Sequence, residues 1–145
     1  MLVKESLSFT RGNEPKDTLG IGQRYLIEKW LEEMHIKYYT INDDLTINVF
    51  SSLYLADKNL TEIPEYIQFN QVKFHFNCQN NKLTSLRGCP NMVRKNFYCD
   101  SNLLTSLEGC PKYVGGFFQC FNNPVRFDRR YINTLCDVKS KKYYT

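Results

Sequence analysis

The sequence predicts an α/β fold, a short solenoid with a parallel sheet, preceded by an N-terminal helix and a β-hairpin cap. The first observation behind this is a repeat, because residues 83–99 and 104–120 match at an offset of 21, for example at Cys89 and Cys110. A fixed period near twenty residues is typical of solenoids. The second is a strand-like Phe-x-Cys pattern in each unit, and the third is one amphipathic helix ahead of the repeats.

The first segment, residues 1–22, is rich in turn formers such as Gly12 and Pro15, and we expect an extended N-terminal arm. Residues 23–50 are predicted to cap the array with a helix and a hairpin. The helix, from Gln23 to His35, carries an apolar stripe of Leu26, Ile27, Trp30, Leu31 and Met34. Repeat arrays need covered ends, so we expect the helix to dock on the first coil and Trp30 to lie in the core.

The hairpin is predicted from two β-rich runs, residues 37–41 and 45–50, on either side of an Asn-Asp-Asp turn. Apolar residues alternate with polar ones in the second run, at Leu45, Ile47 and Val49. One face of the hairpin is therefore expected to be buried, and the hairpin is expected to lead the solenoid sheet.

Residues 51–125 hold the repeats, whose core pattern is Phe-x-Cys-x-x-Asn-x-Leu-x-x-Leu. Alternation places Phe and Cys on one side of a short strand, so Cys78, Cys99 and Cys120 are expected to stack inside the coil. The asparagines that follow each strand, Asn81, Asn102 and Asn123, are expected to turn inward and hydrogen-bond the backbone. A Gly-Cys-Pro turn makes the return, which leaves room only for extended chain or one short helical turn. This pattern resembles the leucine-rich repeat signature.

The six cysteines predict neither a zinc site nor a disulfide framework. Five of them lie at repeat positions, there is no Cys-x-x-Cys pair, and only His35 and His75 could join them in a metal site. Buried free thiols are the simpler interpretation. The chain also lacks a glycine-rich phosphate loop and a Gly-x-Ser-x-Gly elbow, so we expect neither an enzyme, nor a cofactor, nor a small-molecule substrate.

The excess positive charge lies in residues 126–145, which are predicted to form a basic C-terminal cap, with a closing helix or strand that buries Tyr131, Ile132 and Leu135. The basic residues of this tail are Arg126, Arg129, Arg130, Lys139, Lys141 and Lys142. They either meet an acidic partner or nucleic acid, or form a solvated surface. No apolar run approaches ~18 residues and no signal peptide is evident at the N-terminus, so we expect a cytoplasmic protein that does not enter membranes.

Residues between the inward positions are predicted to form a concave binding surface on the strands. They are His75, Asn77, Gln79, Asn96, Tyr98, Asp100, Phe117, Gln119 and Phe121. Exposed aromatic residues are typical anchors of protein interfaces, which favours Tyr98, Phe117 and Phe121 as partner-binding residues. The alternative is that the C-terminal segment folds over Phe117 and Phe121 and covers them.

The opening residues 5–22, the helix after them and the repeated Leu-Thr-Ser-Leu-x-Gly-Cys-Pro motif resemble a family of bacteriophage and prophage proteins. The first repeat departs from that pattern because it lacks the Gly-Cys-Pro turn. The resemblance implies a phage-encoded inhibitor of a host defence protein, in particular an anti-CRISPR protein against an RNA-targeting type VI effector. The expected partner is then a CRISPR-associated ribonucleoprotein, and contact with its RNA stays open. The alternatives are a nucleic-acid-binding module that uses the basic tail, and a structural phage protein.

Overall fold

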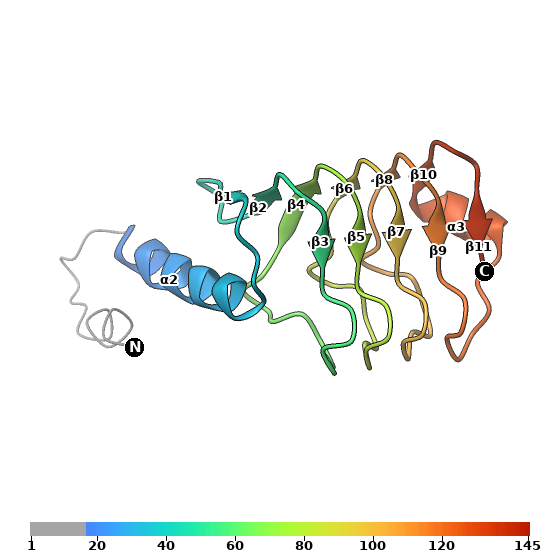
Figure 1. Ribbon diagram of the computed structural model, residues 1–145, viewed down its shortest axis with the longest axis horizontal. Coiled ribbons are helices and arrows are strands. Elements are labelled where there is room, and N and C mark those ends of the chain that lie inside the picture. The colour runs from blue at the N-terminus through green and yellow to red at the C-terminus, as the bar shows by residue number, and fades with distance from the viewer. Residues whose placement is uncertain (1–16) are drawn as a thin grey trace.

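The computed structural model describes residues 17–145, with side chains described from residue 21 onward. The elements, in chain order, are α2 (Asp17–Glu33), β1 (Tyr39–Ile41), β2 (Ile47–Val49), β3 (Leu53–Tyr54), β4 (Phe69–Val72), β5 (Phe76–Asn77), β6 (Met92–Val93), β7 (Phe97–Tyr98), β8 (Tyr113–Val114), β9 (Phe118–Gln119), α3 (Arg129–Leu135), β10 (Asp137–Val138) and β11 (Tyr143–Tyr144). Figure 1 shows a solenoid of stacked coils, with α2 at its N-terminal end and α3 beside the last coil.

The strands form two sheets that both run along the solenoid axis. Sheet A has the order β1-β2-β4-β6-β8-β10, and sheet B has the order β11-β9-β7-β5-β3. All neighbouring strands are parallel except β1 and β2, which form the predicted hairpin and lead sheet A. The solenoid with a parallel sheet is therefore confirmed, and sheet B holds the predicted Phe-x-Cys strands. The second sheet was not predicted, because the sequence pattern predicts one strand in each repeat, the Phe-x-Cys segment, and the one buried valine that marks β4, β6 and β8 (Val72, Val93 and Val114) does not form an alternating pattern.

The N-terminal helix lies at the N-terminal end of the solenoid, where a cap was predicted, but it begins earlier than expected. Residues 17–22 were assigned to an extended arm and are instead the first residues of α2. The sequence predicts turns at Gly20 and Gly22, but both residues lie within α2. Glycine lowers helix stability by about 1 kcal/mol relative to alanine, which does not by itself end a helix. The rest of the predicted arm, residues 1–16, lies outside the described residues. Trp30 is 6% exposed and its ring lies 6.3 Å from that of Phe69, which confirms its place in the core.

The interior is built from rows of identical or similar side chains, one from each coil. Phe76, Phe97 and Phe118 are fully buried, and their neighbouring ring centroids lie 5.6 and 5.0 Å apart. Cys78, Cys99 and Cys120 follow two residues later and are also buried, which confirms the predicted cysteine row. All six cysteines are free thiols. Burial raises the pKa of Cys99 well above its ordinary value and that of Cys120 to about 12.

The asparagine row joins each coil to the one before it. Asn102 is 5% exposed, and its Oδ1 accepts a hydrogen bond from the Leu83 amide at 3.0 Å. Its Nδ2 donates to the carbonyls of Cys78 and Cys99 at 3.0 and 3.2 Å. Asn81 and Asn123 repeat these contacts one coil earlier and one coil later. The predicted inward turn of these residues is confirmed, since each amide satisfies backbone groups that the turn leaves unpaired.

The return turns depend on glycine. Gly88 and Gly109 adopt φ values of +92° and +90°, where a side chain is strained. A Cβ atom on Gly109 would lie 2.7 Å from the backbone carbon of Leu86 in the previous coil. The return segments of these coils are extended chain with turns, in agreement with the prediction.

The C-terminal segment continues the solenoid although the sequence repeat has ended. β10 pairs with β8 and β11 pairs with β9, both in parallel, and α3 takes the place of the Gly-Cys-Pro return. The Asp128 carboxylate caps α3 by accepting a hydrogen bond from the Tyr131 amide at 2.8 Å. Ile132 is buried as predicted, whereas Tyr131 and Leu135 are exposed to 36% and 38%, which corrects their predicted burial. A seven-residue helix has room to bury only one narrow stripe.

Candidate protein-binding surface

The outer face of sheet B carries the second residue of each of its two-residue strands. Strand geometry sends successive side chains to opposite faces, so Phe76, Phe97 and Phe118 point inward and the next residue of each strand points outward. The register aligns these outward residues across the five coils, in the order Tyr54, Asn77, Tyr98, Gln119 and Tyr144. We call this surface, together with the residue preceding each strand, the sheet B face.

Four rings form a continuous row across the sheet B face, which we call the aromatic row. The centroids of His75 and Tyr98 lie 6.2 Å apart, those of Tyr98 and Phe117 5.3 Å apart, and those of Phe117 and Tyr144 4.8 Å apart. The last two pairs are edge-to-face, a favourable geometry for aromatic rings. Because the rings contact one another in sequence, they present a connected apolar surface rather than isolated side chains.

Asn96 holds this row in place through three hydrogen bonds. Its Nδ2 donates to the Tyr98 hydroxyl at 3.1 Å, and its Oδ1 accepts from the Phe117 amide at 2.9 Å. Its own amide donates to Nδ1 of His75 at 3.1 Å, so the neutral imidazole carries its proton on Nε2. The rings are therefore held in place before any partner binds, which lowers the entropy cost of association.

The predicted partner-binding residues fall mostly, but not all, on this surface. His75, Asn77, Tyr98, Phe117 and Gln119 are half-buried on the sheet B face. Gln79 lies just beyond β5 and is also half-buried, and Phe121 lies just beyond β9 with 41% of its surface exposed. The prediction for Asp100 is wrong, because Asp100 is only 2% exposed. Its carboxylate accepts a hydrogen bond from Nε2 of Gln119 at 2.8 Å. The chain leaves strand geometry after Cys99, with a positive φ at Ser101, so the alternation used for the prediction no longer holds there.

Two aromatic residues of this surface were missed, Tyr54 and Tyr144, which are 60% and 46% exposed. The 23-residue offset that relates Leu53 to Phe76 also relates Tyr54 to Asn77, so Tyr54 could have been found from the repeat. Tyr144 could not have been found in this way, because its coil contains α3 and no longer follows the repeat.

The C-terminal segment does reach Phe117, as the alternative interpretation required, but it extends the aromatic surface instead of hiding it. Tyr144 packs against Phe117 and is itself exposed, and Phe121 also stays exposed. The C-terminal segment therefore packs against Phe117 but does not cover Phe121, and β11 supplies the last ring of the row.

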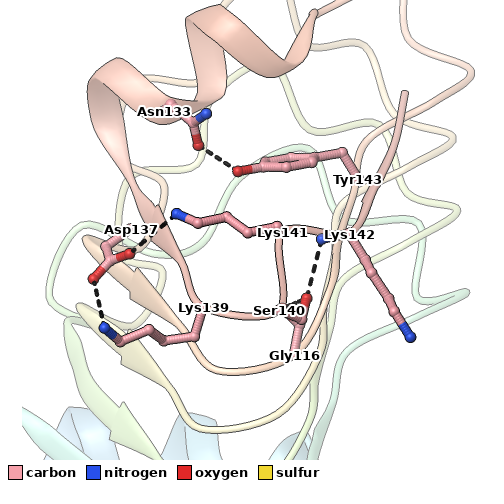
Figure 2. A network of polar contacts seen from close by, with 8 residues as sticks. All are labelled: Gly116, Asn133, Asp137, Lys139, Ser140, Lys141, Lys142 and Tyr143. Carbon is pink, nitrogen blue, oxygen red and sulfur yellow. Dashed lines mark hydrogen bonds and ion pairs between the residues drawn. The ribbon is translucent and has the colours of Figure 1, made fainter.

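The basic tail lies beside this end of the sheet B face. Four of its six residues, Arg126, Arg129, Lys141 and Lys142, surround a hollow of about 580 Å³ that Tyr143 and Tyr144 also line. The Arg129 guanidinium lies 6.0 Å from the centre of the Tyr143 ring. Figure 2 shows how the tail is braced, with Lys139 and Lys141 on either side of Asp137 and the Tyr143 hydroxyl donating to Asn133 of α3. Asp137 thus offsets part of the charge, while Lys142 points away from this network.

A metal site and a membrane-spanning helix are both absent from residues 17–145. No three His, Cys, Asp or Glu side chains in this range gather as a metal site requires. The same range contains no helix of the length and apolarity that crossing a bilayer demands. The sequence matches no protein-family model, no curated protein and no solved structure. The function is therefore argued from the surface itself.

Proposed function

We propose that this chain is a non-enzymatic protein-binding module that docks on a larger protein through the sheet B face. The observation that carries the proposal is the aromatic row, four rings in contact on an open sheet and fixed by Asn96. Aromatic residues dominate the energetic centres of protein interfaces, and rigid ones lose little entropy on binding. Tyr98, Phe121 and Tyr144 are the anchors, because each offers ring surface to a partner.

The resemblance to phage proteins supports a specific partner, a host defence protein, and within that class an RNA-targeting CRISPR effector. The chain then acts as an inhibitor that blocks the effector by occupying its surface. The basic tail supports this choice, because its hollow borders Tyr144 and adds positive charge at one end of the docking surface. Such charge speeds the encounter with an acidic surface more than it strengthens the final complex.

The experiment measures binding of the purified chain to a purified type VI effector by surface plasmon resonance. Replacing a ring anchor typically costs about 2 kcal/mol or more, which is roughly a thirtyfold loss of affinity. Tyr98→Ala and Phe121→Ala should therefore raise the dissociation rate. Tyr66→Ala is the matched control, because Tyr66 is 39% exposed and lies in the return segment of an early coil, away from sheet B. The proposal fails if both anchor variants are folded and bind like the unmodified chain.

The basic tail is tested by charge neutralisation and not by truncation, because residues 137–144 contribute a strand to each sheet. Arg126→Gln with Lys142→Gln should mainly lower the association rate and its dependence on salt. An unchanged association rate would remove the tail from the interface and leave the aromatic row as the sole docking surface.

A further inference from the structure

A second charged surface lies at the corner where each coil passes from sheet A to sheet B. Lys73, Arg94 and Lys95 occupy this corner in two successive coils, and all three are exposed. Their alignment follows from the backbone, since the Arg94 amide donates to the Val72 carbonyl at 3.1 Å and the Lys95 amide donates to the Phe74 carbonyl at 3.0 Å. Adjacent strands are about 4.8 Å apart, so Lys73 and Arg94 are neighbours along the solenoid axis, and Lys95 follows Arg94 in the same coil. We call this surface the basic corner.

The basic corner borders a hollow of about 390 Å³ with a defined lining. Lys73 and Arg94 contribute two cations, Gln71 contributes an amide, and Phe50 contributes an aromatic ring that is 49% exposed. Val49 completes the lining, and no carboxylate is part of it. The hollow thus combines positive charge, an uncharged hydrogen-bonding group and a ring face.

The surrounding charge reinforces this corner. Residues 66–145 hold twelve Lys and Arg against four Asp and Glu, whereas residues 17–65 hold four against nine. Of the four carboxylates in the first range, Asp100 is buried and Asp137 makes both ion pairs that the structure shows within residues 17–145. The three cations of the basic corner take part in neither pair, so their charge is available to a ligand.

The next coil has no side chain at the corner, because Gly115 and Gly116 stand where Arg94 and Lys95 stand in the coil before. A Cβ atom on Gly115 would lie 2.1 Å from the Arg94 carbonyl oxygen, and one on Gly116 would lie 2.0 Å from Oδ1 of Asn96. The glycines are therefore required because the previous coil packs closely against this corner, and they add neither a cation nor a carboxylate beside Lys95.

We propose that the basic corner binds single-stranded nucleic acid, with one base against Phe50 and Gln71 and the phosphates along Lys73, Arg94 and Lys95. Single strands are bound by a line of cations that follows the backbone and by aromatic rings on which bases stack. An acidic protein surface satisfies the cations but leaves the ring and the amide without a role. This site borders the aromatic row, since Asn96 follows Lys95, but it uses other side chains and does not depend on the docking proposed above.

The test is fluorescence anisotropy with a labelled twelve-nucleotide oligouridine RNA and the full chain, from low to moderate salt. The triple variant Lys73→Gln, Arg94→Gln and Lys95→Gln should bind at least tenfold more weakly, and the slope of log K against log salt should fall by about 2, since each lost phosphate contact removes ~0.7. Phe50→Ala should weaken binding roughly tenfold with little change in that slope. The matched control neutralises three exposed lysines elsewhere, Lys29, Lys82 and Lys112.

Four outcomes would overturn the proposal. These are no RNA binding at low salt, an equal loss in the lysine control, a Phe50→Ala variant that binds like the unmodified chain, and equal displacement by polyglutamate of matched charge. A DNA oligonucleotide of the same length distinguishes binding of RNA from binding of any single strand. Equal affinity for both means that the basic corner binds single strands in general, and weaker DNA binding means that it prefers RNA. Thermal melts of each variant, followed by circular dichroism, establish that the fold is intact. The complex with the effector should survive the triple variant, so the two proposals can fail independently.

Discussion

Replacing Asn102 with alanine tests whether the asparagine row holds the coils together. The variant removes one acceptor and two donors at a site that is 5% exposed. The Leu83 amide loses its partner at 3.0 Å and is left buried and unpaired, which costs about 1–3 kcal/mol. The carbonyls of Cys78 and Cys99 each keep a second hydrogen bond, from Asn81 at 3.0 Å and from Asn123 at 3.3 Å, so each lost bond there costs about 0.5–1.5 kcal/mol. We expect a total near 3 kcal/mol.

The assay is equilibrium unfolding in urea, followed by tryptophan fluorescence from Trp30 and by circular dichroism. Asn123→Ala is the comparison, because Asn123 lies one coil nearer the C-terminal end and is only half-buried, so its loss should cost less. Asn102→Asp separates the two functions of the amide, since aspartate keeps the acceptor and loses both donors. A loss below about 1 kcal/mol for Asn102→Ala, or an equal loss for Asn123→Ala, would refute the reasoning.

Two further predictions concern the core. Trp30→Ala should lower the free energy of unfolding by about 3–5 kcal/mol, because the ring is 6% exposed and packs on Phe69; an unchanged melting temperature would move Trp30 out of the core. Buried thiols such as Cys120 and Cys136 should react with Ellman's reagent only as fast as the chain unfolds, since burial raises the pKa of both to about 12. Above the ordinary thiol pKa of 9.0 the unfolded chain loses these protons first, so stability should fall as the pH rises from 9 toward 12, by up to about 1.4 kcal/mol per pH unit for each thiol. A melting temperature that is constant over this range would contradict the buried thiols.

The repeat made most of the fold predictable, because each identical position repeats one physical environment. Phe97 and Asn102 are placed correctly from a single strand pattern and a single turn. The errors arise where the chain leaves that pattern. Asp100 lies two residues after the end of β7 and is drawn inward by the turn, and Tyr144 belongs to a coil whose spacing α3 has changed. The basic corner was missed because Lys73, Arg94 and Lys95 lie between the strands at positions that do not repeat, since the next coil has Gly115 and Gly116 there.

The same stacking also sets how stability is distributed along the molecule. A middle coil has neighbours on both sides, whereas β11 and β3 end sheet B and each pairs with a single strand of that sheet in the part of the chain that the structure describes. In such a one-dimensional array, local opening is most frequent at an end with a single neighbour. Backbone amides of sheet B should therefore exchange with deuterium fastest at β11 and β3 and slowest near β7. The sheet B face then has a rigid middle at Tyr98 and a yielding end at Tyr144, and a bound partner should slow exchange most at the yielding end.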